Sequence, residues 1–353
     1  MARKKRRRRS CSQNRANTGA EKRKVADEKV IDNILNEDSV KRWIQKLTVN
    51  SKSMDFSQSQ TQRAALFWLK NYCNYLKLKP DTVIKQRTAD LESTIQIIKR
   101  KHEEMLEGYI LNLKNEGYAP NTVAVATGLV RSFYKSNYAA IVEVKTPRSY
   151  NIRAFKVPTV KDLKAMAAKA DPIIKAWILC QANCGLANTD LLSLNGSTAS
   201  SEFGTIKSQL KKGIVPIHIE IRRQKTGEKV DTFLGPNAIE ALRGYIAEGE
   251  NGRLFHISMR SIQQKVKALG IKSKVATNEV PVTSYSMRKF FNTQMKYAGV
   301  NESIVELMMG HSIGKVRSAY LVTGSGDVGT GIPVSKLAEI YMNAYPTIDI
   351  TKV

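Results

Sequence analysis

The C-terminal half of the chain carries four side chains whose chemistry together suits phosphoryl transfer without a metal. His311 follows Gly310 in L-M-M-G-H-S, and Tyr320 comes nine residues after the histidine. Arg288 stands in Y-S-M-R-K and Lys225 in Q-K-T-G. Arginine and histidine can stabilise the charge on a phosphorane, lysine can protonate a leaving 5′ oxygen, and tyrosine can attack phosphorus. Because the pKa of free tyrosine is about 10, this nucleophile would need a neighbouring base and a cationic field.

Each of these residues also has a structural interpretation that involves no reaction. Gly310 and His311 can be a helix end, Tyr320 a buried ring, Arg288 a solvated charge, and Lys225 the tip of a turn. The sequence shows no obvious cluster of acidic residues of the kind that holds two metal ions in nucleases. The reactive hypothesis therefore expects neither a metal nor another cofactor.

The charge of the chain indicates a polyanionic partner. Lys and Arg number 57 against 31 acidic residues, which gives a formal net charge of +26 and a pI near 9.9. Such an excess favours nucleic acid. An anionic membrane is the rival, but the sequence has no basic amphipathic helix with a broad aromatic face and no apolar run of about eighteen residues. We therefore expect a nucleic acid partner and no membrane.

The cysteines predict neither a zinc site nor disulfides. Cys11, Cys73, Cys180 and Cys184 form no Cys-x-x-Cys pair, and no cluster of histidines accompanies them. Cys180 and Cys184 would share one helix face as small buried thiols. The N-terminus has no apolar segment behind its charges and does not look like a secretory signal. We expect a reduced, cytoplasmic protein associated with the nucleoid of its host cell.

The chain begins with a basic arm. Residues 1–24 contain R-K-K-R-R-R-R and predict a disordered arm, in which Arg6, Arg7 and their neighbours would contact phosphates. In residues 25–56, apolar side chains recur at helical spacing, so a helical segment is expected there.

Residues 57–142 show helical periodicity and no strand pattern, which predicts a compact helical domain. The apolar residues from Leu66 to Leu76 predict one helix that ends near Lys79-Pro80, and another helix, long and interrupted, is expected over about 81–115. A last helix would be capped by Asn121 or Thr122.

A linker and a second domain follow. Residues 143–157 are polar and basic without periodicity, as is typical of a linker. The second domain, residues 158–353, opens with Thr159 as a helix cap and Asp162 three residues later, a capping box.

The sequence contains one good strand signal. Residues 215–223 alternate apolar and polar side chains, 224–229 form a turn, and 230–234 return, which predicts a β-hairpin with Lys225 at its tip. The rest of the domain is expected to be almost entirely helical.

The helices after the hairpin have clear ends. We expect Thr283 or Ser284 to cap the helix that carries Arg288, and a helix N-terminus beside an arginine favours phosphate. Asn301 should cap the next helix and Gly310 should end it. A last helix is expected over about 333–344.

These motifs resemble those of the tyrosine recombinases of the phage-integrase family, over about residues 57–345. The strongest match is L-M-M-G-H-S with its tyrosine nine residues after the histidine. Y-S-M-R-K is similar to the family's H-x-x-R box and Q-K-T-G to its hairpin lysine. The resemblance implies that Tyr320 is the nucleophile, that His311 and Arg288 bind the phosphate, and that Lys225 is the general acid.

The resemblance also implies an architecture and an assembly. The fold would be mainly α, with a core-binding domain at 57–142 and a catalytic domain with a small antiparallel sheet at 158–353. The C-terminal helix would dock on a neighbouring protomer. The chain would form a homo-tetramer on double-stranded DNA and stay a monomer or weak oligomer when free. R-R-Q-K-T-G and the ending A-E-I-Y-M-N-A-Y-P look most similar to integrases of archaeal viruses and mobile elements.

Two positions depart from the family pattern. Where the family has an arginine that clamps the scissile phosphate, this chain has C-G-L-A-N-T-D with Ala187, although Asp190 matches the acidic position. Tyr285 stands where histidine is usual, which leaves the general base open. Three explanations of the alanine are open: an engineered substitution that traps a DNA complex, a natural subgroup with altered chemistry, or compensation by Arg222 or Arg223.

The leading hypothesis is a site-specific DNA recombinase that forms a 3′-phosphotyrosyl intermediate. A recombinase-derived DNA-binding protein that no longer cuts is the runner-up, and an enzyme like a type IB topoisomerase is a third interpretation. Besides the reactive residues, a further set is expected to contact DNA: Arg222, Arg223, Lys289, Arg6 and Arg7.

Overall fold

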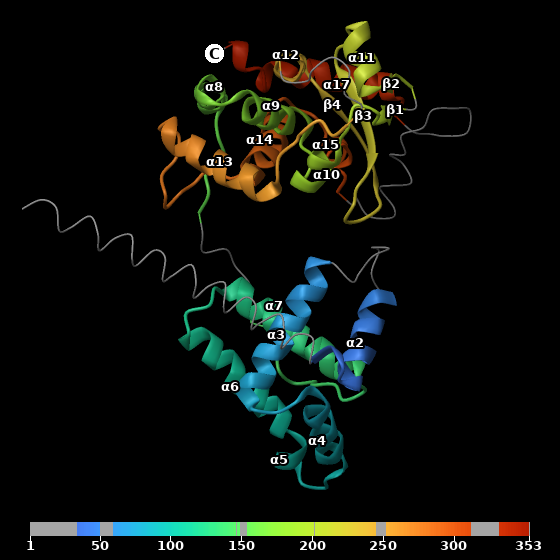
Figure 1. Ribbon diagram of the computed structural model, residues 1–353, viewed down its shortest axis with the longest axis vertical. Coiled ribbons are helices and arrows are strands. Elements are labelled where there is room, and N and C mark those ends of the chain that lie inside the picture. Colours follow the sequence, from blue (N-terminus) through green and yellow to red (C-terminus); the bar gives the residue numbers. More distant parts are fainter. Residues whose placement is uncertain are drawn as a thin grey trace, which may run out of the picture. The chain divides into compact units, whose positions relative to one another are not determined.

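A computed structural model shows a chain that divides into two units, Met1–Ile152 and Arg153–Val353 (Figure 1). Each unit has a core of its own. The structure describes residues 34–49, 59–145, 147–148, 154–200, 202–244, 252–311 and 332–352. The predicted class, mainly α with small antiparallel sheets, is confirmed. In the described residues, no helix combines the length and the apolar character needed to cross a membrane.

The described part of unit 1 is entirely helical. Its elements are α2 (Asp38–Val49), α3 (Gln60–Leu76), α4 (Pro80–Glu92), α5 (Gln96–Lys99), α6 (Lys101–Asn115) and α7 (Pro120–Ser136). The long helix expected over 81–115 is three helices, because the chain leaves helical geometry at Ser93 and again turns at Arg100.

The start of α7 corrects the sequence prediction. Pro120 is the first helical residue and Ala119 is the N-cap, so neither Asn121 nor Thr122 caps this helix. A proline at the first helical position has the required φ and lacks only an N–H that would have no partner. The same rule places Pro80 at the start of α4.

The core of unit 1 contains a buried ion pair among aromatic rings. Nη1 and Nη2 of Arg87 donate to the two carboxylate oxygens of Glu103 over 2.7 and 2.6 Å. The guanidinium also donates to the main-chain carbonyls of Lys99 and Ala140. The Arg87 side chain is only 2% exposed, so its charge depends on these partners. The pair fastens α4 to α6 and to the chain that follows α7.

Unit 2 contains the two sheets. Its elements are α8 (Val160–Lys169), α9 (Pro172–Cys184), α10 (Asn188–Ser193), β1 (Ala199–Ser200), β2 (Gly204–Thr205), α11 (Ile206–Lys212), β3 (Ile217–Arg222), β4 (Lys229–Leu234), α12 (Pro236–Arg243), α13 (Met259–Lys272), α14 (Ser284–Tyr297), α15 (Glu302–Met308), α17 (Val334–Ala344) and the 3-10 turns η1 (Tyr345–Thr347) and η2 (Ile350–Lys352).

The expected hairpin is confirmed. Strands β3 and β4 pair antiparallel from Ile217 opposite Leu234 to Arg222 opposite Lys229. The pair β1–β2 was not expected, because strands of two residues are too short to show alternation. The capping box at Thr159 is also confirmed, since the Asp162 N–H donates to its hydroxyl over 3.2 Å and the Thr159 N–H to the Asp162 carboxylate.

Helix α9 forms the centre of unit 2. Its residues from Ala176 to Cys184 are all buried, and α8, α12, α14 and β4 pack around it. A helix that is apolar on all sides is typical of such a position. Cys180 and Cys184 lie here as buried thiols, as expected, and burial raises the pKa of Cys184 to about 12.

The C-terminal helix α17 packs into the same core in this single chain. Leu337 and Tyr341 are fully buried, and the Tyr341 hydroxyl donates to Oδ1 of Asn183 over 3.3 Å. The apolar stripe of α17 is thus buried in its own unit, and its docking on a neighbouring copy stays a prediction.

Replacing Glu103 by alanine should destabilise unit 1. The change leaves the guanidinium of Arg87 buried without its carboxylate, and breaking such a pair costs about 3–5 kcal/mol. Urea unfolding monitored by tryptophan fluorescence measures the loss. Glu104→Ala, at the exposed neighbouring position, is the control and should unfold like the unmodified protein. Equal midpoints for the two variants would contradict a stabilising role for the ion pair.

Candidate functional site

Helix α14 holds Arg288 in the interior of unit 2. Thr283 caps the helix with a reciprocal pair of hydrogen bonds to Ser286, so the expected cap is confirmed. Phe290, Phe291 and Met295 form the expected buried stripe. Arg288 lies one turn inside the helix and is only 3% exposed.

The guanidinium of Arg288 is held by the C-terminal ends of two other helices. Nη1 donates to the carbonyl of Gly185, the C-cap of α9, over 2.5 Å. Nη2 donates to the carbonyl of Met309, the C-cap of α15, over 2.9 Å. The C-terminus of a helix carries partial negative charge, which stabilises a cation. Burial lowers the pKa of Arg288, and the charge of the nearby Arg223 lowers it further.

Gly310 turns the chain so that His311 meets this arginine. The His311 N–H donates to the Glu306 carbonyl and the Gly310 N–H to the Leu307 carbonyl, the two bonds of a Schellman motif. Gly310 has a φ of +67°, and a Cβ there would lie 2.3 Å from Cγ2 of Val230. Glycine is therefore required both for the backbone conformation and for the space.

The hydrogen bonds of His311 define its tautomer. Nε2 lies 2.5 Å from Nη2 of Arg288, which can only donate, so Nε2 must be the acceptor. Nδ1 then carries the proton and donates to the carboxylate of Glu306. The ring is thus a neutral imidazole held between an acid and a guanidinium.

The hairpin brings a second arginine to the same place. Nε of Arg223 donates to Oδ2 of Asp190 over 3.2 Å, and Nη1 donates to the carbonyl of Gly310 over 2.7 Å. The N–H of Gln224 donates to the other oxygen of Asp190 over 3.1 Å. Asp190 lies in the short helix α10 and is almost fully buried. It therefore fastens the turn end of the hairpin beside Arg288.

The other described residues predicted from the sequence make no hydrogen bond to Arg288 or His311. Lys225 is exposed at the tip of the hairpin and Arg222 is exposed beside it. Ala187 is the half-buried N-cap of α10. Tyr285 is 48% exposed, with its ring edge-on to Phe155.

Lys289 is exposed and lies over the ring of Tyr285, with Nζ 5.9 Å from the ring centroid. Tyr320, Arg6 and Arg7 fall outside the described residues. The expected nucleophile therefore has no described position.

Sequence reasoning missed Glu306 and the two carbonyl groups. Glu306 could have been found, because the Schellman motif brings the residue five positions before His311 back to it. No side-chain pattern announces the carbonyls of Gly185 and Met309, since any residue type supplies the same group.

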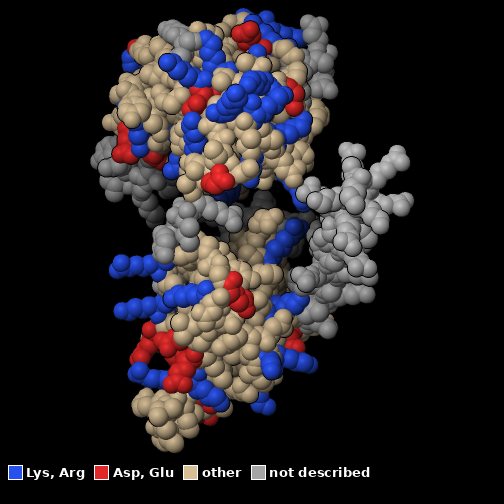
Figure 2. Space-filling model, turned by 90° about the vertical axis from the view of Figure 1, so that its left-hand side faces the viewer, with Lys and Arg blue, Asp and Glu red and all other residues tan. Residues whose placement is uncertain are grey.

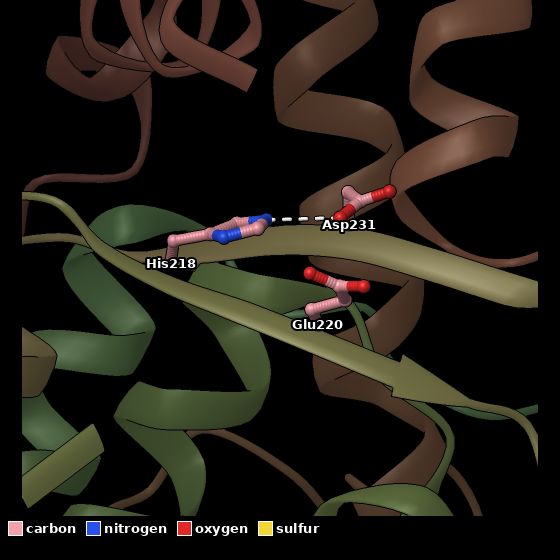
Figure 3. Close-up of side chains that lie close together, drawn as sticks. All are labelled: His218, Glu220 and Asp231. Carbon is pink, nitrogen blue, oxygen red and sulfur yellow. Dashed lines mark hydrogen bonds and ion pairs between the residues drawn. The ribbon is translucent and has the colours of Figure 1, made fainter. Parts of the chain in front are cut away.

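A second polar cluster lies on the hairpin (Figure 3), formed by His218, Glu220 and Asp231 with Ser200 and Lys229 beside it. Nε2 of His218 lies 3.0 Å from Oδ1 of Asp231, and Nδ1 lies 2.6 Å from the hydroxyl of Ser200. Nζ of Lys229 lies 3.1 Å from the Glu220 carboxylate and 3.6 Å from that of Asp231.

This cluster has a structural role. His218 and Asp231 are almost fully buried, and both ring nitrogens of the histidine are already hydrogen-bonded. A metal or a substrate would have to displace these partners. The cluster instead ties β1 to the middle of the hairpin.

Basic side chains are widespread on the surface. On the face drawn in Figure 2, Lys and Arg are more frequent than Asp and Glu over both units. This distribution agrees with the net charge of +26.

Known proteins match this chain in fold. No family model and no curated relative matches the sequence. A crystal structure of the XerH site-specific recombinase bound to its difH substrate, a pre-cleavage complex, aligns with 83% of this chain and 93% of that chain. Its sequence identity is 13% and its TM-score 0.50. The post-cleavage complex of XerH on a palindromic difH substrate aligns with 82% of this chain and 94% of that chain, at the same identity and TM-score.

At this identity the likeness shows the fold. The chain has the fold of site-specific tyrosine recombinases, and these two neighbours were solved on DNA.

Replacing Gly310 by alanine should destabilise unit 2 and displace His311. Positive φ costs a non-glycine residue about 1–2 kcal/mol, and the clash with Val230 and Arg223 adds about 1–3 kcal/mol more. Thermal unfolding measures the total. Gly299→Ala is the matched control, because Gly299 has a φ of +80° with nothing within 4 Å of a new Cβ. If both variants lose the same free energy of unfolding, the close packing around Gly310 contributes nothing to stability.

Proposed function

We propose that this protein is a site-specific DNA recombinase that cuts and rejoins duplex DNA through a 3′-phosphotyrosyl intermediate. The observation that carries the proposal is the direct hydrogen bond between Arg288 and His311, which lie 23 residues apart, at the meeting of three helices. Its setting is the fold of recombinases, and the net charge of +26 fits a DNA partner.

In the proposed reaction the phenol oxygen of Tyr320 attacks the scissile phosphorus. The new tyrosine–phosphorus bond forms as the bond to the 5′ oxygen breaks, and Lys225 gives that oxygen a proton. Arg288 and His311 stabilise the charge on the non-bridging oxygens in the transition state. The phosphotyrosine ester conserves the energy of the broken bond. Attack by another 5′ hydroxyl therefore rejoins the strand without ATP or a metal.

His311 must change its hydrogen bonds for this role. In the free protein Nε2 accepts from Arg288 and has no proton to give. A bound phosphate competes for the guanidinium and releases Nε2, which can then accept the phenol proton of Tyr320. The protonated ring, still held by Glu306, becomes a donor to phosphate. Tyr285 is the other candidate for the base, although it makes no hydrogen bond to the cluster.

The DNA contacts and the assembly are part of the proposal. Arg222 and Lys289 are exposed on unit 2 and can reach phosphates, and the basic arm with Arg6 and Arg7 adds a sequence-independent contact. Strand exchange needs two duplexes held together, so we propose a homo-tetramer on DNA. We further propose a mobile element or virus, of archaeal type, as the source, acting at the nucleoid of its host.

Ala187 favours a second candidate function. Without an arginine there, the protein could be a DNA-binding protein derived from a recombinase that no longer cuts. A type IB topoisomerase would use the same chemistry on one duplex. Covalent adducts separate the first alternative from the proposal, and joining of two duplexes separates the second.

The deciding test is a covalent adduct on a nicked duplex. The protein first selects a binding site from a pool of random duplexes. The scissile strand carries a nick a few nucleotides beyond the cleavage point. Cleavage then releases a short fragment with a free 5′ hydroxyl, which diffuses away and cannot rejoin. The trapped adduct is seen as a band of reduced mobility in a denaturing gel. We expect an adduct from the unmodified chain and none from Tyr320→Phe, because phenylalanine has no nucleophilic oxygen.

The controls keep binding separate from chemistry. Tyr320→Phe should retain salt-dependent DNA binding, and Tyr297→Phe, at an exposed tyrosine of α14, should form the adduct normally. Absence of any Tyr320-dependent adduct from both the unmodified chain and Ala187→Arg would overturn the recombinase proposal and leave the DNA-binding protein.

A further inference from the structure

We infer that Arg223 binds the scissile phosphate beside Arg288 and takes the part of the arginine that is absent at position 187. The inference rests on the proposed function and names a phosphate ligand for it. Arg223 would then be a catalytic residue, because its guanidinium touches the reacting phosphate.

Two consecutive carbonyl groups place the two arginines side by side. Arg288 donates to the carbonyl of Met309 over 2.9 Å, and Arg223 donates to that of Gly310 over 2.7 Å. His311 comes next in the chain and bonds to Arg288. The three cationic or polar heads therefore converge on one turn of the backbone.

Gly310 lets Arg223 approach this turn. A Cβ at position 310 would lie 2.5 Å from Cδ and 3.1 Å from Cγ of Arg223, so the side chain lies directly against the glycine. The Arg223 side chain is only 11% exposed, which is low for an arginine beside the turn of a hairpin. Its direction is set by packing as well as by hydrogen bonds.

No carboxylate is hydrogen-bonded to Arg288 within the described residues, which leaves its guanidinium able to bind an anion. Asp190 is paired with Arg223, and Glu306 is bonded to His311. Within the described residues Arg288 has only carbonyls and an imidazole as partners. The charge of Arg223 is close enough to lower the pKa of Arg288, a sign of repulsion between the two cations. A phosphate between them would relieve that repulsion and accept hydrogen bonds from both.

Arg223 has a donor to offer. Its Nε and Nη1 are engaged, while Nη2 has no hydrogen-bond partner among the described residues. Arg222 differs in each respect, because it is exposed and its one described hydrogen bond is to the Gly227 carbonyl, over 3.3 Å. The neighbouring arginine therefore lacks the contacts that hold Arg223 beside Arg288.

The alanine at 187 is consistent with this arrangement. Ala187 precedes Asp190 by one turn of α10, as shown by the Leu191 N–H, which donates to the Ala187 carbonyl over 2.9 Å. An arginine at 187 would start from the same short helix as Asp190, the carboxylate that now holds Arg223. Arg223 and an arginine at 187 would therefore be two ways to bring a guanidinium to one place.

The test measures the rate of covalent adduct formation on the nicked duplex described above. We expect Arg223→Ala to lower the rate by about 10²–10³-fold, the cost of removing one donor to a transition-state oxyanion. Arg243→Ala is the control, at an exposed arginine of α12 whose one described hydrogen bond is to the Leu210 carbonyl, and it should react at close to the unmodified rate. Adding Ala187→Arg to Arg223→Ala should restore most of the loss, whereas Ala187→Arg alone should gain little.

A second substrate distinguishes phosphate binding from a structural role. A methylphosphonate at the scissile position replaces one charged non-bridging oxygen by a neutral methyl group. If Arg223 acts on that charge, the penalty of Arg223→Ala should shrink to within about tenfold. A purely structural Arg223 would give the same penalty on both substrates, and that result would overturn the inference. If a thermal scan shows that Arg223→Ala is unfolded at the assay temperature, Arg223→Lys replaces it in the same comparison. Lysine keeps the positive charge but lacks the paired N–H donors of the guanidinium.

The outcomes for Arg223 and for the recombinase proposal are distinguishable. An adduct from the unmodified chain that is insensitive to Arg223→Ala refutes the role of Arg223 and leaves the recombinase standing. An adduct only from Ala187→Arg does the same, since it shows that Arg223 does not replace the missing arginine. Loss of all Tyr320-dependent adducts refutes both.

Discussion

The buried guanidinium of Arg288 is the constraint on which the rest of the site depends. A cation that is 3% exposed must find compensation within the protein, and here it comes from the carbonyls that end α9 and α15. Those two helix ends must therefore meet at α14. The central position of α9, the cap at Thr283 and the turn at Gly310 each contribute to that meeting. Because the guanidinium can only donate, it also requires Nε2 of His311 to be the acceptor, which fixes the tautomer of the neutral imidazole.

A second consequence is that the site uses main-chain oxygens where carboxylates would be expected. A carboxylate beside Arg288 would neutralise it and compete with a phosphate. Carbonyl groups at helix ends hold the guanidinium in place with only partial charge, so its affinity for an anion is retained. Asp190 and Glu306 instead bind Arg223 and His311, the two neighbours of Arg288.

The sequence predicted those parts of the structure that depend on local pattern. Alternation gave the hairpin, the capping box at Thr159 needed only four residues, and the glycine before His311 ended its helix as expected. At the start of α7, Pro120 rather than Asn121 or Thr122 fixes where the helix begins, because the proline ring favours the first helical position. The breaks between α4, α5 and α6 were only partly visible, since the apolar spacing continues through them.

The contacts that define the site were beyond local pattern. Arg222 and Arg223 are adjacent and chemically equal in the sequence, and only the fold shows that one meets Asp190, 33 residues earlier, and Gly310, 87 residues later. His218 of the hairpin drew no expectation from the sequence, and only the fold shows that Ser200 and Asp231 bind its two ring nitrogens. The roles of Tyr320 and Lys225 stay predictions. Tyr320 lies outside the described residues, and Lys225 is exposed without a hydrogen bond to Arg288 or His311.

The hairpin is fastened at two levels, and this confines its freedom. In the ladder, His218 connects it to Ser200 and Asp231, and at its turn end Asp190 binds both Arg223 and Gln224. Beyond Arg223 comes the turn from 224 to 228, closed by the N–H of Arg223 donating to the Glu228 carbonyl. Lys225 is exposed in this turn, one residue beyond the last position that Asp190 binds. Arg223 is the boundary between the anchored strands and the turn, because its side chain is bonded to both Asp190 and the Gly310 carbonyl.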